Sequence, residues 1–409
     1  MSTVTLVGPP EHLGRLWGEI NGADIRAHLS EFYTLAQREH GLSETVLCAR
    51  AQAYVDMVAE LAPHWHAEAQ AVALAAGVEP ARYNAFLAGR YRGLLFHEEC
   101  TSYAAVGSAT ADGRPLFHKN RDNRMRRQAF YRKHTIGGSG GVAVLPFIAV
   151  GDTSDTGVMM MVNAAGLAGS ADMGGADLRP RYRGLMNPYG LRLIAEQATT
   201  CAEALGLVAE MTARGQYAGG GIATRWTFAD RHGRAVVALN THEAVVIEAD
   251  TRDGIVQSCP REGLEELLAE RRGCLCAADF DAASRLPGVC VRENCSSLTV
   301  HIDPARPDLF TCAWAALGRA QDAPYVPLYM GAAETPREYL DGTVYTWSER
   351  GLTPRAIARF ELHCRAYRVL AEAAARTALS AGREAGARRR LAQAAEFAAA
   401  QGDNALAAE

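Results

Sequence analysis

A cysteine and a polar, charged tract stand at the two ends of a predicted strand pair. Cys100 begins the segment Cys100-Thr-Ser-Tyr, which alternates as a strand does, and the turn signal Asp112-Gly leads back into Pro115-Leu-Phe-His. The tract Lys119-Asn-Arg-Asp-Asn follows the second strand. Because the start of one hairpin strand lies beside the end of the other, we expect Cys100 and this tract to meet at one end of a sheet.

A thiol needs a base or a lowered pKa to act as a nucleophile at neutral pH. No histidine stands in an evident Cys–His pattern, although any of the 12 could approach in space. If the chain is cut before Cys100, the freed α-amino group, with an ordinary pKa of about 8, can take the thiol proton. Asp122 would then orient the ammonium, and Lys119 or Asn120 would hold the tract or the substrate. Taken singly, these residues are also compatible with a core cysteine and an ordinary turn.

The composition excludes several other classes of protein. The chain has 409 residues, 48% of them hydrophobic, and its formal net charge of −4 lacks the basic surplus typical of nucleic-acid binding. No apolar run reaches the roughly 18 residues needed to span a bilayer, and the N-terminus lacks a basic, then apolar leader. We therefore expect a cytoplasmic protein that contacts neither nucleic acid nor membrane.

The ten cysteines and the glycine-rich stretches give no sign of a metal or cofactor. No C-x-x-C pair occurs, and neither Cys274-Leu-Cys276 nor His64-Trp-His66 has a second half at metal-binding spacing. Without a secretion signal, reduced thiols are expected. No G-x-G-x-x-G, P-loop or G-x-S-x-G motif is present. We predict neither a metal nor a cofactor.

The apolar periodicity predicts an α+β protein with largely antiparallel sheets. Residues 11–95 are predicted to be helical, and short strands follow from Cys100 onward. A single long helix is predicted over 188–214, then a three-strand meander over 223–249. From Pro354 the Ala- and Arg-rich chain predicts helices with a break near 382–386.

Several motifs together resemble a known family. They are Cys100-Thr-Ser-Tyr, Asn120-Arg-Asp122, Asn163-Ala-Ala-Gly-Leu167, the helix Arg192–Leu205, and Ala229-Asp-Arg-His-Gly. These resemble the N-terminal nucleophile cysteine hydrolases, in particular the isopenicillin N acyltransferase (acyl-coenzyme A:6-aminopenicillanic acid acyltransferase) family. The resemblance to choloylglycine hydrolases and to penicillin V acylase is more distant. The resemblance extends over residues 10–330, most of the chain.

The resemblance implies an αββα four-layer N-terminal nucleophile sandwich in a precursor that cuts itself between Glu99 and Cys100. Residues 1–99 would be the helical pro-segment that becomes the α chain. Residues 100–335 would form the sandwich, or β chain, and residues 336–409 a C-terminal helical extension.

The resemblance also implies roles for individual residues. Cys100 would be the nucleophile and Asp122 the aspartate beside it, while Lys119 falls where bile-salt hydrolases carry an arginine. Further candidates are Asn163 at the catalytic centre and three residues that would contact substrate: Tyr103, Asn120 and Arg121.

Two positions depart from the family pattern. Glu99 replaces the glycine before the nucleophile. Cys259, in Val256-Gln-Ser-Cys-Pro260, stands where the family has the asparagine that donates to the oxyanion. A thiol is a weak donor, and loss of one oxyanion donor typically slows catalysis by ~10²–10³-fold. Replacement donors would be Asn163, Asn240, Asn294 or a backbone N–H near Asp172.

The predicted function is that of a self-processing cysteine acyltransferase or amide hydrolase of specialised metabolism. Its acyl donor would be a small amide, acyl-coenzyme A or a carrier-protein thioester, and the acyl group would pass through a Cys100 thioester to a small amine or to water. The C-terminal helices would be available for homo-oligomer contacts. Two alternatives remain: an unprocessed enzyme with His97, His118 or Asp122 as its base, and a non-catalytic binding protein with a degenerate site.

Overall fold

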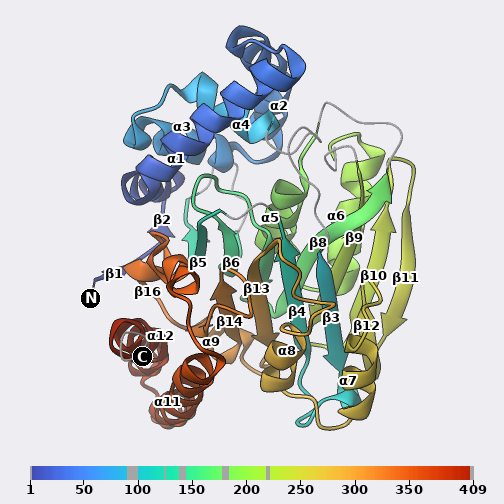
Figure 1. The fold of residues 1–409 in the computed structure, drawn as a ribbon, viewed down its shortest axis with the longest axis vertical. Coiled ribbons are helices and arrows are strands. Elements are labelled where there is room, and N and C mark those ends of the chain that lie inside the picture. The colour runs from blue at the N-terminus through green and yellow to red at the C-terminus, as the bar shows by residue number, and fades with distance from the viewer. Residues whose placement is uncertain are drawn as a thin grey trace.

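The computed structural model describes residues 2–89, 100–123, 126–137, 144–176, 184–217 and 222–405. Two large β-sheets lie at its centre (Figure 1). The first contains, in spatial order, β11 (Val245–Thr251), β10 (Ala235–Asn240), β9 (Ile222–Asp230), β8 (Leu167–Ala176), β7 (Met160–Asn163), β6 (Phe147–Asp152), β5 (Gln128–Thr135) and β2 (Val7–Gly8). Only β2 pairs in parallel within this described sheet.

The second sheet is antiparallel throughout its described strands. Its order is β12 (Gly254–Gln257), β3 (Thr101–Val106), β4 (Leu116–Asp122), β13 (Asn294–His301), β14 (Cys312–Leu317) and β15 (Tyr325–Tyr329). A small separate pair joins β1 (Thr3–Val4) to β16 (Thr335–Pro336). The hairpin predicted from the Asp112-Gly turn is confirmed as β3 and β4, and the meander as β9, β10 and β11.

Helices cover the outer faces of both sheets. The first sheet is covered by α5 (Asn187–Gln197) and α6 (Cys201–Ala213), and the second by α7 (Leu264–Glu270) and α8 (Ala277–Ala283). Alternation along the strands sorts the side chains: Ala104 and Val106 of β3 belong to the core between the sheets, whereas Tyr103 and Ala105 pack under α7 and α8. The expected αββα four-layer sandwich is therefore confirmed.

The N-terminal helices gather at one end of the sandwich (Figure 1). They are α1 (Pro10–His40), α2 (Glu44–Leu61), α3 (Pro63–Ala76) and α4 (Pro80–Gly89). Glycines let α1 approach α3 closely, because a Cβ at Gly14 would lie 2.3 Å from the carbonyl oxygen of Glu68 and one at Gly18 would lie 2.5 Å from that of Val72. The predicted helical character of this segment is confirmed as far as Gly89.

The C-terminal helices form part of the same molecule's core. The two long helices of this part are α11 (Pro354–Ser380) and α12 (Glu384–Ala405). Their buried residues, such as Phe360 and Leu391, belong to the same hydrophobic core as residues of β14 and β15. The break between them lies at 381–383, as predicted. The shorter elements of this half are α9 (Pro307–Phe310), α10 (Thr343–Trp347), η1 (Gly107–Ala109), η3 (Arg337–Tyr339) and η4 (Ser348–Arg350).

The prediction of one helix over 188–214 is wrong, because the structure has α5 and α6 with an extended break at Ala198–Thr200. The Thr200 side chain accepts a hydrogen bond from the backbone N–H of Glu203 at 3.2 Å and so caps α6. At the end of α5, Asn163 Nδ2 donates hydrogen bonds to the backbone carbonyl groups of Ala195 and Ala198. The apolar spacing continues through the break, so periodicity alone does not reveal it.

Candidate active site

Cys100 and Asp122 are brought to the same end of the second sheet by the β3–β4 register. Thr101 pairs with Asn120, so the residue before Thr101 lies beside the last two residues of β4, Arg121 and Asp122. Cys100 is 2% exposed and Asp122 is 1% exposed. The proximity of strand start and strand end predicted from the hairpin is thus present in the fold.

The Asp122 carboxylate is buried, and the hydrogen bonds around it only partly replace its contacts with water. Its Oδ1 accepts a hydrogen bond from Asn294 Nδ2 at 3.3 Å, whereas Oδ2 has no hydrogen-bond partner among the described residues. Burial raises the pKa of Asp122 to about 7, although the Asn294 hydrogen bond and the positive charges of Arg261 and Lys119 oppose this shift. Near neutral pH this carboxyl group can therefore both accept and release a proton.

A buried ion pair joins the two sheets beside this carboxylate. Lys119 Nζ, on β4, donates to Asp172 Oδ1 on β8 at 2.9 Å and also to the backbone carbonyl of Ala171. Asp172 is fully buried, and within the described structure its Oδ2 has no hydrogen-bond partner. Asp172 also raises the pKa of Asp122, which places both carboxylates in one electrostatic group. Nearby, the hydroxyl groups of Ser102 and Ser170 bridge the sheets at 2.7 Å.

Cys259 lies at the same end of the sheet, just after β12. Its neighbour Ser258 accepts a hydrogen bond from the Ser102 N–H through its hydroxyl group at 2.9 Å and donates its own N–H to the Ser102 carbonyl at 2.8 Å. Arg225 Nη1 is 4.0 Å from the Cys259 sulfur. Burial and the charge of Asp172 raise the pKa of the Cys259 thiol, while Arg225 and Arg261 lower it. Cys259 therefore lies within electrostatic reach of Asp172, Arg225 and Arg261.

We call this group the polar cluster: Cys100, Lys119, Asp122, Asp172, Arg225, Cys259 and Arg261. Arg261 belongs to it because its Nε donates to Thr101 Oγ1 at 3.1 Å, beside the nucleophile candidate. The cluster combines two thiols, two buried carboxylates and three cations at the junction of β3, β4, β8 and β12. A thiol beside a carboxyl group that titrates near neutrality has the components of nucleophilic catalysis.

The structure does not bring Tyr103 and Asn120 to the polar cluster. Tyr103 faces the α7–α8 layer, where its hydroxyl group donates to the Phe280 carbonyl at 2.9 Å and its ring stacks on His118. Asn120 Nδ2 donates to the carbonyl groups of Ser284 and Val289 at 2.9 and 3.1 Å. Both side chains therefore hold the second sheet to its helical layer, and the structure gives no support to a substrate contact.

Arg121 and Asn163 also serve the fold. Arg121 Nη1 donates to Asp152 Oδ1 at 2.6 Å and to Gln128 Oε1 at 2.9 Å, which ties β4 to the first sheet. Asn163 accepts hydrogen bonds from the N–H groups of Ala165 and Leu167, both at 3.1 Å, while its amide N–H₂ group binds α5. Asn163 ends β7, next to the turn into the start of β8, whereas Asp172 lies in the second half of β8. Its donors are occupied, so its placement does not support donation to an oxyanion.

The two other asparagines considered as oxyanion donors have different surroundings. Asn294 Nδ2 contacts Asp122 and the carbonyl groups of Arg121 and Ser296, so it positions the carboxylate. Asn240 lies at the end of β10 and accepts from Thr212 Oγ1 at 3.0 Å. Glu99 and His97 lie outside the described residues.

The N-terminal helices cover the loops that border the polar cluster. Trp17 Nε1 donates to the Thr153 carbonyl at 3.1 Å, and Tyr83 donates to the Ser154 carbonyl at 3.3 Å. Thr153 in turn donates to Asp24 Oδ2 at 2.9 Å. These contacts fix the β6–β7 loop, which begins at the Asp152 partner of Arg121. The helical segment is therefore part of the wall around this end of the sandwich.

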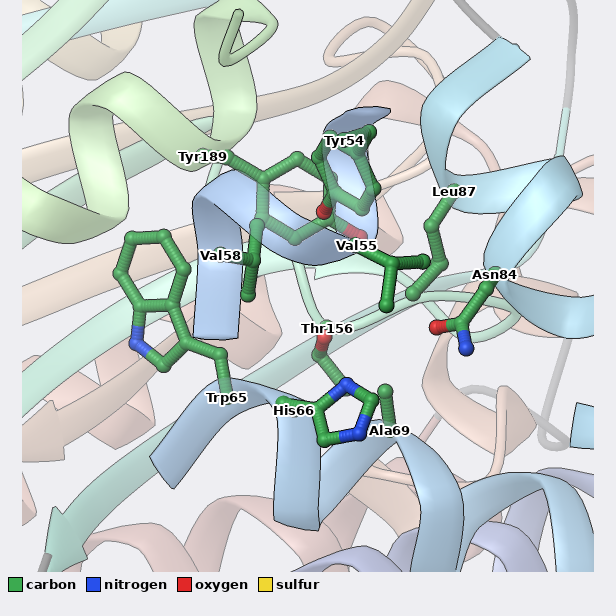
Figure 2. A pocket seen from close by; sticks show the side chains of 10 residues that line it. All are labelled: Tyr54, Val55, Val58, Trp65, His66, Ala69, Asn84, Leu87, Thr156 and Tyr189. Atoms are coloured by element: carbon green, nitrogen blue, oxygen red, sulfur yellow. The ribbon is translucent and has the colours of Figure 1, made fainter. Parts of the chain in front are cut away.

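A small cavity lies between this helical segment and the sandwich. Figure 2 shows Tyr54, Trp65 and Asn84 from α2, α3 and α4 around it, with Thr156 and Tyr189 from the sandwich. Its volume of about 10 Å³ holds no more than a single water molecule. It is too small for a substrate.

Three members of the polar cluster were missed by sequence reasoning. Asp172 was considered only for its backbone, yet a lone charged residue in the otherwise small and apolar run Leu167-Ala-Gly-Ser-Ala-Asp is itself a signal of a buried ionic site. Arg225 stands on β9 directly opposite Asp172, and Arg261 follows Cys259. No sequence signal distinguishes these two among so many arginines.

Within the described ranges the chain has neither a metal-binding cluster nor a membrane-spanning helix. No set of three or more His, Cys, Asp or Glu side chains that could hold a metal ion occurs there. Nor does any helix in that part of the chain have the length and apolar character needed to cross a bilayer.

Comparison with known proteins gives only distant likenesses. No family model matches the sequence, and neither does any curated protein. Among solved structures, penicillin V acylase from Agrobacterium tumefaciens aligns with a TM-score of 0.40 and 12% identity over 56% of this chain and 86% of that chain. An N-acylethanolamine-hydrolyzing acid amidase ortholog from Caenorhabditis elegans gives 0.37 and 11% over 51% and 94%. A variant of conjugated bile acid hydrolase from Clostridium perfringens gives 0.36 and 12% over 56% and 92%. Likenesses of this size establish neither a shared family nor a shared activity.

Proposed function

We propose that this protein is a cysteine amide hydrolase or acyltransferase in which Cys100 carries the acyl group as a thioester. The observation that supports this most is the placement of a buried cysteine at the start of β3 beside Asp122, a buried carboxyl group whose pKa burial raises to about 7. The sequence resemblance described above points to the same chemistry. Its donor would be a small amide or thioester of specialised metabolism.

In the first step the Cys100 sulfur attacks the carbonyl carbon of the acyl donor. The C–S bond forms, the C–N bond of an amide breaks, and the proton lost by the thiol leaves with the amine. In the second step water or an acceptor amine attacks the thioester, the C–S bond breaks, and the thiol recovers a proton. Backbone N–H groups near Asp172, together with Cys259, would face the oxyanion.

Two bases can serve this chemistry, and they define two versions of the proposal. If the chain is cut before Cys100, the new α-amino group takes the thiol proton and Asp122 orients it. If the chain stays intact, Asp122 itself is the base, which its unpartnered Oδ2 and its pKa of about 7 favour. Neither version needs a metal or cofactor.

Intact mass and denaturing electrophoresis of the wild type beside Cys100→Ala separate these versions. Fragments 1–99 and 100–409 in the wild type, with only full-length Cys100→Ala, would establish self-cleavage. Full-length chain in both would refute self-cleavage, and if Asp122 is then the base, Asp122→Asn should abolish labelling of Cys100 by iodoacetamide at pH 7. A Cys100 thiol no more reactive than the buried Cys312 would refute an acyl-transfer role altogether.

A further inference from the structure

A second cavity lies on the outer face of the second sheet, between α8 and α11. Figure 1 shows these two helices in the lower part of the molecule. The cavity has a volume of about 280 Å³, close to the size of small-molecule sites. Its apolar lining includes Leu116, Leu275 and Val369, and Trp314 also borders it. Such a space can hold the apolar body of a small ligand.

Two arginines one turn apart on α11 line this cavity, while their carboxylate partners do not. Arg365 Nη2 binds Asp281, and Arg368 Nη1 lies 3.2 Å from Glu372 Oε2. Arg368 Nη1 also lies 3.4 Å from the Tyr329 hydroxyl oxygen. Among the described residues, the Nε and second terminal nitrogen of each guanidinium group have no hydrogen-bond partner. Both groups therefore keep donors for a ligand.

The balanced charges around the cavity favour a ligand with a single negative charge over one with two. Four arginines, Arg114, Arg365, Arg368 and Arg376, are balanced by four carboxylates, which belong to Asp112, Asp281, Asp303 and Glu372. Of these carboxylates, that of Asp112 lines the cavity. Asp112 is shared between Arg114 at 3.5 Å and the His301 ring at 3.1 Å, so it does not compete for the α11 arginines. A formally neutral surrounding with directed guanidinium donors suits a carboxylate better than a doubly charged phosphate.

This cavity is separate from the polar cluster. Leu116 stands at the beginning of β4 and Asp122 at its end, so the two sites are about 20 Å apart at roughly 3.3 Å per residue. The cavity opens under the C-terminal helix α11, whereas the polar cluster lies at the end covered by the N-terminal helices. A ligand here would not touch Cys100.

We propose that the α8–α11 cavity binds a small monocarboxylate with an apolar body. The carboxylate accepts hydrogen bonds from Arg365 and Arg368, and the apolar body packs against Leu116, Leu275 and Val369. This site is independent of the reaction proposed for Cys100, and it gives the protein a second small-molecule ligand.

Isothermal titration calorimetry with octanoate tests this proposal on the full-length protein. We expect one octanoate per chain, with 1-octanol, which has the same apolar body, binding at least about tenfold more weakly. Arg368→Gln should weaken octanoate binding by about tenfold or more, because one charged donor is lost. Arg355→Gln, an exposed substitution on the same helix outside the cavity, should leave it unchanged.

A second variant tests the location without removing a charge. Ala278 is exposed, lies in the first turn of α8 and lines the cavity, so Ala278→Leu fills the space at little cost to the fold. We expect it to abolish octanoate binding while the far-ultraviolet circular dichroism stays the same. Absence of octanoate binding to the wild type at 10 mM, equal affinity for 1-octanol, or undiminished binding by either Arg368→Gln or Ala278→Leu would each overturn the proposal.

Discussion

The substitution Asp122→Asn tests whether this carboxyl group carries the buried, poorly compensated charge that the structure gives it. The folded protein holds the pKa of Asp122 at about 7, whereas the ordinary value is 3.8. Between these values the folded chain keeps a proton that the unfolded chain has lost. Stability from this group is therefore full at acid pH and falls as pH rises, by about 1.4 kcal/mol per unit.

The asparagine variant keeps the Oδ1 acceptor for Asn294 but cannot ionise. Its unfolding free energy, relative to the unsubstituted chain, should therefore increase by about 2 kcal/mol between pH 5 and pH 7 and level off near pH 8. Urea unfolding at pH 5, 6, 7 and 8 measures this difference. All chains should carry Cys100→Ala, so that self-cleavage does not divide the sample into two covalent forms.

A matched control is Asp322→Asn, since Asp322 is a solvent-exposed carboxylate whose side chain is 44% accessible. Its effect on stability should vary little over the same pH range. If the Asp122→Asn difference is also flat with pH, the Asp122 carboxyl group is not buried uncompensated, and the argument for its role as a proton acceptor near neutrality fails.

Three further predictions concern the buried charges and the second thiol. Glu68→Gln should lower the unfolding free energy in urea by about 3 kcal/mol, because it leaves the buried Lys133 without its carboxylate partner, although Arg192 keeps Glu196 at 2.9 Å. The exposed Glu19→Gln should cost under about 0.5 kcal/mol. Adding Lys133→Met to Glu68→Gln should cost less than the sum of the two single effects, since neutrality returns. Lys119→Met should also destabilise by about 3 kcal/mol at pH 7, because it leaves the buried carboxylate of Asp172 without its cation. Cys259→Asn should raise the rate of acyl-enzyme formation from a chromogenic amide by about tenfold or more, because an amide N–H donates better than a thiol; an unchanged rate would place the oxyanion elsewhere.

Local signals in the sequence predicted the elements, and the resemblance predicted how they stack. The Asp-Gly turn marked the β3–β4 hairpin, and the turns at 230–233 and 240–242 marked the meander. The break between α5 and α6 could not be predicted, because the side chain that ends α5 is Asn163, far away in the sequence. The same contact gives Asn163 a structural role, because its side chain holds the turn before β8 and the end of α5.

Local patterns in the sequence could predict only those members of the polar cluster that lie on one hairpin. Cys100, Lys119 and Asp122 lie on one hairpin, so the register alone brings them together. Asp172 and Arg225 come from the other sheet, and their arrival depends on how the two sheets face each other, which no local pattern encodes. The close α1–α3 approach at Gly14 and Gly18 was likewise missed, although the four-residue spacing of the glycines was there to be seen.

Buried ion pairs hold the N-terminal helical segment to the sandwich. Glu68 on α3 contacts Lys133 on β5 and lies 2.6 Å from Arg192 on α5, and His64 lies 2.8 Å from Glu196. Separation would expose or strand every one of these groups, in addition to the apolar surface around them. A cut before Cys100 would therefore not release the helices, because the bond that breaks lies outside the contacts that hold the parts together. Size-exclusion chromatography under native conditions cannot then distinguish the cut protein from the intact one, and only a denaturing measurement reports on the Glu99–Cys100 bond.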